Sequence, residues 1–346
     1  MPINYEPIDT TTDVATTRTL LHEVIPLTGT IVSGTYGTFP NDDNIKNYSH
    51  GMFQSVYDYP YLSSSANHIF DLTAGFDESS PLSGSVSSVQ ETKKINMYNQ
   101  FSQVLLGYTG STNRVRLFES DLTLDEDSPM KETIFVNLSR LLTKDEIKKG
   151  SVSITLGTAS WANPFSGVKT FTDAGATENA GTLNTIGGDY GLLSSSTAGV
   201  GGVVFYQAGV MVLTSSIWTG TTDFFSQSGT ARTFDNQLVS GSISGSADAF
   251  RHRLQNLQFN NTTEINSTVY FCRMPHNKFN YSSNPTYLNA GSIRVKNNSR
   301  NNPPISYITT VGLYNSQNEL LAVAKLSEPL RKDPTNELTL RVRLDY

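Results

Sequence analysis

The sequence of 346 residues contains a single cysteine, Cys272, and five histidines. One cysteine excludes an internal disulfide, and without a Cys-x-x-Cys pair the commonest structural zinc motifs are excluded too. The histidines form neither His-x-x-x-His nor His-Glu-x-x-His, so no zinc site is predicted. Because Cys272 lies in the run Tyr-Phe-Cys-Arg-Met, we expect a buried packing residue and not a nucleophile. The histidines are His22, His50, His68, His252 and His276.

Charged residues are scarce, at 16% of the sequence, and the formal net charge is −6. Proteins dedicated to nucleic acids usually carry a basic surface, so we expect no dedicated nucleic-acid binding. No apolar run approaches the length of a membrane span, and none is predicted. The N-terminus has neither the basic start nor the apolar core of a signal peptide. We therefore expect the chain to fold in a reducing cytoplasm.

Motifs of known catalytic and cofactor sites are also missing. No Gly-x-Ser-x-Gly elbow occurs, and the glycine-rich stretch 187–191 lacks the Lys-Ser/Thr pair of a phosphate-binding loop. The acidic stretch 121–127 has carboxylates that suit calcium, but it lacks the Gly and Glu positions of an EF-hand, so a solvated loop is expected. Nothing singles out an acid–base pair for glycoside cleavage. We predict no catalytic, cofactor-binding or metal-binding residue and no cofactor.

The sequence is instead rich in small polar and aromatic residues. Gly, Ser, Thr and Asn are abundant, and there are 16 tyrosines and 17 phenylalanines. This mixture is typical of β-rich chains with many turns and argues against a helical bundle. The predicted fold class is mainly β, with β-sandwich-like sheets and a few short α-helices; an α+β fold is the alternative.

The clearest strand pattern lies near the C-terminus. Residues 307–312 and 320–326 are β-branched or apolar runs separated by a polar turn, which predicts a hairpin. A charged connection at 330–333, bracketed by two prolines, leads to residues 338–346, where apolar and polar side chains alternate. We expect this last strand to be fixed in a sheet with its apolar side buried.

The same region carries a resemblance to a known family. The runs Asn280-Tyr-Ser-Ser-Asn-Pro, Ser306-Tyr-Ile-Thr-Thr-Val-Gly-Leu-Tyr and the final Leu-Arg-Val-Arg-Leu-Asp-Tyr resemble the C-terminal part of virion structural proteins of large contractile-tailed bacteriophages, including those of cyanobacteria. The resemblance implies a component of the virus particle without assigning its ring or layer, and it carries over no catalytic residue. Weaker likeness extends to Phe135-Val-Asn-Leu, Asp145-Glu-Ile-Lys-Lys-Gly-Ser and Val204-Phe-Tyr-Gln-Ala-Gly.

The strongest helix signal covers residues 88–106. It opens with a capping box, in which the Ser88 hydroxyl accepts an unpaired backbone amide and Glu91 reaches back to the cap. Apolar residues recur on one side at helical spacing, and Gly107 follows as a C-terminal cap. The predicted buried stripe is Met97, Phe101, Val104 and Leu105.

Two further helices are predicted. A second capping box at Thr143 opens one helical turn that ends at Gly150. Residues 246–259 form the other helix, which Ser246 caps and whose apolar stripe faces the core. The stripe is Phe250, Leu254 and Leu257, whereas Arg251, His252 and Arg253 are expected to face solvent or a partner.

Strands and a change of composition define the predicted domains. Residues 158–202 consist mostly of Gly, Ser, Thr and Ala, and we interpret them as a long surface insertion or as a projection that touches a partner. The predicted strands are 133–140, 151–157, 202–215 (a strand pair or bent strand about Ala208-Gly209) and 268–274. The domains are a 1–19 extended N-terminal arm, a 20–157 mixed β domain with one helix, the 158–202 insertion, and a 203–346 β-rich C-terminal domain with one helix.

Two segments near the N-terminus have alternative interpretations. Residues 1–19 are polar and lack periodicity, which indicates either a disordered terminus or an arm that becomes ordered on a neighbouring subunit. Residues 48–76 concentrate aromatic side chains, which suit a core, a contact surface toward other subunits, or a platform for glycans. These aromatic residues are Tyr48, Phe53, Tyr57, Tyr59, Tyr61, Phe70 and Phe76.

The favoured function is a non-enzymatic structural subunit of a tailed bacteriophage virion. We expect it in the tail or baseplate, or in the neck, where it holds neighbouring subunits in a symmetric assembly. Its expected partners are copies of itself and other virion subunits, and its expected location is the virion, assembled in the host cytoplasm. The alternative is a receptor-binding, adhesin-like tail module that recognises bacterial surface glycans; a tail-associated hydrolase is a third class.

Overall fold

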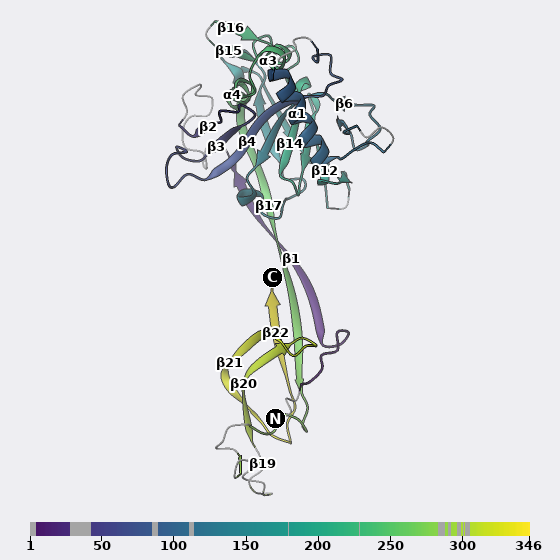
Figure 1. Cartoon of the computed structure of the whole chain (residues 1–346), viewed down its shortest axis with the longest axis vertical. Coiled ribbons are helices and arrows are strands. Elements are labelled where there is room, and N and C mark those ends of the chain that lie inside the picture. The colour runs from purple at the N-terminus through teal and green to yellow at the C-terminus, as the bar shows by residue number, and fades with distance from the viewer. Residues whose placement is uncertain are drawn as a thin grey trace. The chain divides into compact units, whose positions relative to one another are not determined.

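The computed structural model describes most of the chain (Figure 1). Its contacts divide it into two compact units: unit 1 consists of residues 1–20 and 264–346, and unit 2 of residues 21–263. The division falls inside two strands, β1 (Val14–Pro26) and β17 (Leu254–Met274). The sequence analysis placed its boundaries after residues 19, 157 and 202. The described residues are 5–27, 43–84, 89–110, 114–178, 180–227, 229–282, 288–289, 292–295, 299, 301 and 305–346.

Strands dominate both units, which confirms the mainly β class with a few short helices. The helices are α1 (Val89–Leu105), α2 (Arg140–Thr143), α3 (Phe234–Ser240) and α4 (Ile243–Arg253), with single 3-10 turns η2 (Pro164–Ser166) and η3 (Ser215–Trp218). The strands up to β9 are β2 (Ile45–Asn47), β3 (Gln54–Tyr57), β4 (His68–Phe76), β5 (Phe118–Glu119), β6 (Pro129–Met130), β7 (Glu132–Leu138), β8 (Glu146–Ile147) and β9 (Ser153–Gly157), in addition to β1. Those that follow are β10 (Val168–Thr172), β11 (Thr182–Thr185), β12 (Gly188–Ser195), β13 (Gly199–Phe205), β14 (Val210–Thr214), β15 (Phe225–Gln227), β16 (Thr230–Arg232), β18 (Leu288–Asn289), β19 (Ser292–Val295), β20 (Ser306–Tyr314), β21 (Leu320–Lys332) and β22 (Leu338–Asp345), in addition to β17.

The core of unit 2 is built on the antiparallel strands β13, β14, β7 and β4, which are neighbours in the largest sheet. Val136 of β7 lies opposite Leu72 of β4 and Met211 of β14, so these three side chains share one face. Phe135 and its partner Val212 occupy the other face. All five are fully buried, because both faces of the sheet are covered.

Helices cover the two faces of this sheet. Leu238 of α3 and Phe250 of α4 belong to the apolar cluster on the first face, whereas Tyr98 of α1 belongs to the cluster on the second. The helix α1 crosses β4 closely at Gly75, where a Cβ atom would lie 2.6 Å from the backbone oxygen of Lys94. Gly75 therefore sets how near α1 can approach the sheet.

The first predicted helix is confirmed as α1. It ends as expected, because Gly107 has a positive φ of 82° and donates its backbone N–H to Ser102 O at 3.0 Å. The predicted cap, Ser88, lies outside the described residues. Of the predicted stripe, Met97 and Leu105 are buried and Phe101 is half-buried, but Val104 is 67% exposed.

The predicted helical turn from Thr143 to Gly150 is wrong. The short helix α2 ends at Thr143, and the next residue, Lys144, adopts a positive φ of 57° that stops the helix. Asp145 N then donates to Thr262 O at 3.1 Å, and β8 pairs with β17. Pairing with a strand distant in the sequence therefore overrides the local capping pattern.

The predicted helix 246–259 exists in part, as α4, but it begins and ends earlier. Its cap is Ser242, whose hydroxyl accepts the N–H of Gly245 at 3.0 Å. Residues from Leu254 onward belong to β17, where they pair with β9. The predicted stripe is buried nonetheless, with Phe250 on the helix and Leu254 and Leu257 on the strand.

Residues 158–202 are not a surface insertion. They contribute β10, β11, β12 and the start of β13 to the largest sheet, with Phe171 paired to Ile154 of β9. Phe171 and Leu193 are fully buried. A Cβ atom at Gly201 would collide with the ring of Phe171, so this glycine is a close packing position and not a mark of a loop.

The remaining strand predictions agree with the structure. β7, β9 and the β13–β14 pair match the predicted strands, and the predicted strand 268–274 is the end of β17. At the C-terminus, β20 and β21 form the predicted hairpin, and β22 pairs with β17, Val342 opposite Tyr270. One detail differs: β21 continues to Lys332, so Pro329 and residues 330–332 of the predicted charged connection lie inside the strand.

Candidate functional site

The hairpin of β20 and β21 in unit 1 is the leading candidate for a binding surface. Its turn is fixed by Asn315, whose side-chain oxygen accepts the N–H groups of Gln317 at 3.0 Å and Glu319 at 2.8 Å. Asn318 takes the positive φ, 64°, that the turn requires. Tyr314 lies opposite Leu320, and a bulge at this point displaces the residue that follows Leu320.

Unit 1 has a thin core. Among its described residues, four apolar side chains are buried, whereas the large apolar clusters of the chain belong to unit 2. So few buried residues cannot cover both faces of the β20–β21 hairpin, and some of its apolar side chains are therefore exposed to solvent. The four buried residues are Val269, Met274, Leu313 and Val342.

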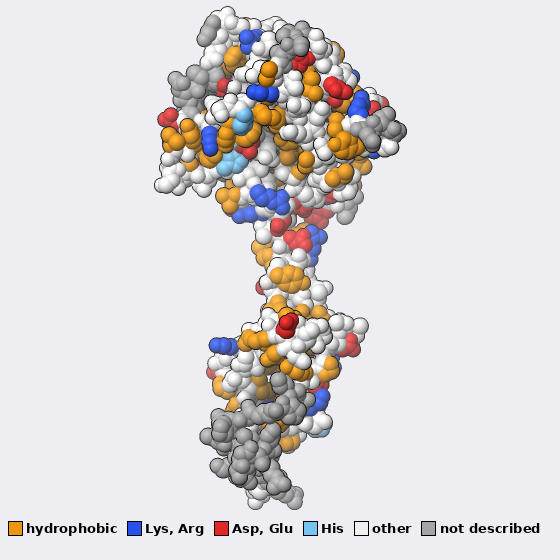
Figure 2. Space-filling view, in the orientation of Figure 1, with side chains coloured by type: hydrophobic (Ala, Val, Ile, Leu, Met, Phe, Trp, Pro, Cys, Tyr) orange, Lys and Arg blue, Asp and Glu red, His pale blue; other side chains and the backbone are white. Residues whose placement is uncertain are grey.

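Several large apolar side chains of β20 and β21 are exposed, and we call them the hairpin patch. Leu321 is 68% exposed and Tyr307 63%. Orange side chains at the surface of this unit are visible in Figure 2. A two-stranded sheet is marginally stable in water, and exposed apolar strands usually mark an interface. The members of the hairpin patch are Tyr307, Tyr314, Leu320, Leu321 and Val323.

The N-terminal residues lie against the chain's own strands. The ring of Tyr5 contacts that of Tyr314 edge to face, with centroids 5.1 Å apart, and Glu6 pairs with Lys278 at 2.5 Å. Asp13 O accepts the N–H of Phe271 at 2.8 Å, and β1 begins at the next residue. The structure thus describes residues 5–19 as part of unit 1 and not as an arm that reaches away from it.

The aromatic residues 48–76 include buried, half-buried and exposed side chains, and Tyr48, Phe53 and Tyr57 are the half-buried ones. Phe70 and Phe76 are fully buried, so for these two the core interpretation is right. Tyr59 and Tyr61 are 53% and 37% exposed. Exposed aromatic rings remain available for contact with another molecule.

Polar side chains accompany the exposed rings. The ring of Tyr57 lies 5.6 Å from that of His68, which in turn contacts Asp71 at 2.8 Å. Asp58 accepts the backbone and side-chain N–H groups of Asn67 at 2.6 and 2.8 Å. The fold thus brings more polar groups close to these aromatic rings than their positions in the sequence indicated.

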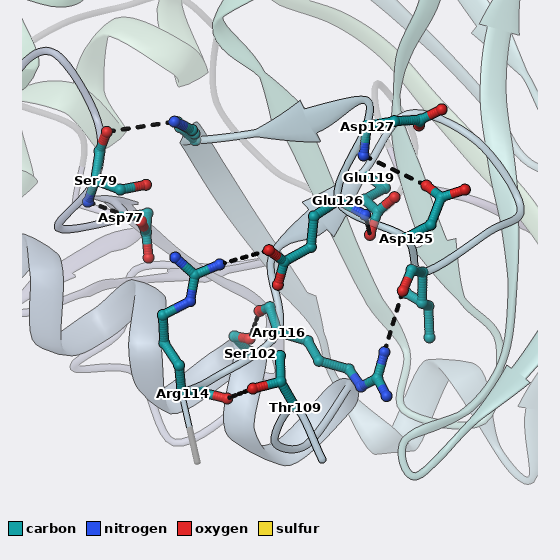
Figure 3. Close-up of polar contacts among 12 residues, drawn as sticks. Asp77, Ser79, Ser102, Thr109, Arg114, Arg116, Glu119, Asp125, Glu126 and Asp127 are labelled. Carbon is teal, nitrogen blue, oxygen red and sulfur yellow. Dashed lines mark hydrogen bonds and ion pairs between the residues drawn. The ribbon is translucent and has the colours of Figure 1, made fainter. Parts of the chain in front are cut away.

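The end of β5 and the acidic loop that follows it bring four carboxylates together, and Figure 3 shows three of them, Glu119, Asp125 and Asp127. One oxygen from each of Glu119, Asp121, Asp125 and Asp127 lies within 4.8 Å of those of the other three, and we call this group the carboxylate cluster. Residues 121–127 are recognisable in the sequence as an acidic stretch, but the participation of Glu119 was not predicted. The spacing Glu-x-Asp-x-x-x-Asp-x-Asp is the signal that would have included it.

No protein-family model, curated protein or solved structure matches this chain. The resemblance to phage virion proteins therefore stays a prediction from the sequence. Among the described residues, no helix is both long enough and apolar enough to cross a membrane.

The prediction that Arg251, His252 and Arg253 face solvent or a partner is wrong for the two arginines. Arg251 is 2% exposed and its Nε donates to Gln54 Oε1 at 3.0 Å. Arg253 is fully buried and donates to four backbone carbonyls, including Ala159 O at 2.7 Å. Arg251 thus links α4 to β3, and Arg253 links α4 to the segments around Ala159 and Asp223.

Cys272 and the other histidines form no site in the described residues. Cys272 is half-buried, and burial, with the charge of Asp13, raises the pKa of its thiol. A thiol with a raised pKa is a weak nucleophile at neutral pH, and the packing role of Cys272 stays a prediction. His276 contacts Glu337 at 3.2 Å on the surface.

Proposed function

We propose that this chain is a non-enzymatic structural subunit of a tailed bacteriophage virion, in the tail or baseplate or in the neck, and that unit 1 binds neighbouring copies of the chain. The observation that carries the proposal is the hairpin patch on strands that have little core beneath them. The sequence resemblance of residues 280–346 supplies the setting. Both features lie in the same unit.

A second copy of the chain is the occupant that the chemistry of the patch favours. Its five members are apolar or aromatic, and Gly312, opposite Val323, adds no charge. Interfaces of this composition are typical of permanent assemblies, whose subunits bury the patch as they would a core. In a symmetric ring the same contact occurs between every pair of neighbouring copies. The binding free energies of these modest interfaces together stabilise the ring.

The proposal is tested by locating the chain in particles of the phage that encodes it. A cryo-EM map is expected to contain the chain in several symmetry-related copies at the tail, baseplate or neck, with β20 and β21 at a contact between subunits. Absence of the chain from purified particles would contradict the proposal. Density confined to fibre tips would favour the alternative below.

The alternative is a receptor-binding tail module, and the exposed Tyr59 and Tyr61 beside the Asp58–Asn67 pair favour it. Aromatic faces and acidic or amide groups together suit sugar rings and hydroxyls. Binding to bacterial surface polysaccharide on a glycan array, lost in Tyr61→Ala, would support this function. A chain that binds no polysaccharide would exclude it.

A further inference from the structure

The loop that joins β5 to β6 is held in a fixed shape around its carboxylates. Asp121 Oδ1 accepts the N–H of Thr123 at 2.8 Å and its hydroxyl at 2.7 Å, while Ser128 donates to Asp121 Oδ2. The buried hydroxyl of Tyr190 donates to the backbone oxygens of Asp121 and Thr123, both at 3.2 Å. These bonds position Asp121 before any ligand arrives.

Glu119 is the member of the carboxylate cluster that a solvated loop does not explain. Glu119 is only 3% exposed, and its side-chain oxygen Oε1 accepts the backbone N–H of Glu126 at 3.1 Å. Its Oε2 is buried and has no hydrogen-bond partner. A buried carboxylate oxygen without a donor is costly, and such groups are rare in folded proteins. The carboxylate that carries this unpartnered oxygen has an oxygen within 4.8 Å of those of three further carboxylates, two of which, Asp125 and Asp127, are drawn in Figure 3.

The nearby arginines do not supply that positive charge. Arg114 pairs with Glu126 at 2.9 Å, and Arg116 donates to the backbone oxygens of Tyr108 and Leu124, both at 3.3 Å. Within the described residues, neither guanidinium forms an ion pair with the carboxylate cluster. At neutral pH the negative charges of neighbouring carboxylates repel one another, and no cation among the described residues pairs with this cluster.

The donor set decides which ligand fits. All four side chains offer oxygen, without a histidine or cysteine, which selects a hard cation. Mg²⁺ usually takes one or two carboxylates and keeps its waters, whereas Ca²⁺ accepts several carboxylates in flexible geometry. We propose that Glu119, Asp121, Asp125 and Asp127 bind one Ca²⁺ ion, which gives the buried carboxylate of Glu119 a positively charged partner and offsets two negative charges of the cluster.

A bound ion would tie the strand end that holds Glu119 to the exposed Asp125 and Asp127. A ligand that binds only the folded chain stabilises it by mass action, so calcium is expected to raise the melting temperature. It also protects the loop between β5 and β6 from proteolysis, because an ordered loop is cleaved more slowly.

The test uses the full chain, stripped of metal with a chelator and titrated with CaCl₂ or with MgCl₂ in a calorimeter. We expect one Ca²⁺ to bind per chain and Mg²⁺ to bind more weakly. Terbium is a second probe, since the ring of Tyr190, bonded to the loop, can sensitise its luminescence. Calcium is expected to displace terbium and to quench that luminescence.

Two variants make the test specific. Asp125→Asn removes one exposed ligand charge and is expected to weaken calcium binding by about tenfold or more. The matched control is Glu126→Gln, since Glu126 is the next residue but pairs with Arg114 outside the cluster; its calcium affinity should equal that of the wild type. The proposal is overturned if the wild-type chain binds no calcium, or if Asp125→Asn binds it as tightly as the wild type does.

Discussion

Two buried cations in unit 2 donate hydrogen bonds to backbone carbonyls of segments that are distant in the sequence. Lys94, fully buried in α1, donates from Nζ to Leu238 O and, at 2.7 Å, to Gly241 O. Both carbonyls lie at the C-terminal end of α3, where helical partners run out. Arg253 does the same for loop carbonyls, among them Asp223 O at 2.8 Å. Each cation therefore links its own helix to a distant part of the chain by hydrogen bonds.

The burial of Lys94 predicts how stability depends on pH. Burial lowers the pKa of its ammonium from 10.5 to about 8. The unfolded chain therefore binds more protons than the folded chain between these values, so stability rises with pH across this window and is lost as the pH falls toward 8. The free energy of unfolding should increase by about 2 kcal/mol between about pH 7 and about pH 9.5.

Urea denaturation at the two pH values measures this increase in the wild type and in two variants. Lys94→Met is expected to abolish the increase, because it removes the titrating group. Lys93→Met is the control: this neighbour is half-buried and donates to the backbone oxygen of His50, so the increase should persist. An increase of the same size in Lys94→Met would show that other groups cause it.

At the scale of single residues, the sequence shows which chemical groups are present but does not show which of them the fold buries. The carboxylates of residues 121–127 are visible in the sequence, whereas the role of Glu119 depends on a burial that only the fold creates. Arg251 and Arg253 were predicted to be exposed because charged side chains are rarely buried. Their burial depends on carbonyl and amide partners that are distant in the sequence.

At the scale of elements, strands with a strong apolar pattern were predictable. Residues 202–215 and 338–346 were recognised as strands because their long apolar runs or alternation leave few other structures. Residues 158–202 were not, because β10, β11 and β12 carry few large apolar residues, and because β12 and the start of β13 contain several glycines. At some of these positions only glycine fits, because a neighbouring group would collide with any side chain. At Gly202, for example, a Cβ atom would lie 2.2 Å from the backbone oxygen of Val212.

Gly202→Ala tests this explanation. Because the obstacle is backbone, the sheet must shift to admit a methyl group, and the free energy of unfolding should fall by about 2 kcal/mol. The matched control is Gly175→Ala, since a Cβ atom there meets nothing within 4 Å. We expect thermal unfolding to be unchanged in the control. Equal melting temperatures for Gly202→Ala and the wild type would refute the close-packing account.

At the scale of the whole molecule, the division into two units was not predicted from the sequence. Unit 1 joins both ends of the sequence, residues 1–20 and 264–346, and composition along the chain cannot reveal such a discontinuous unit. The contrast between the units is physical: unit 2 has large buried clusters, and unit 1 has a thin core with exposed apolar strands. That contrast is the reason to expect a partner at unit 1.

Sedimentation equilibrium of the full chain tests this expectation most directly. The wild type is expected to have a mass that is a multiple of the 37.9 kDa chain, and the double variant Leu321→Asp, Val323→Asp should sediment as a monomer, because buried charges disfavour the contact. Asp at the exposed Ile186 of unit 2, which lies outside the hairpin patch, is the control and should leave the assembly intact. A wild-type chain that remains monomeric at every concentration would contradict the account.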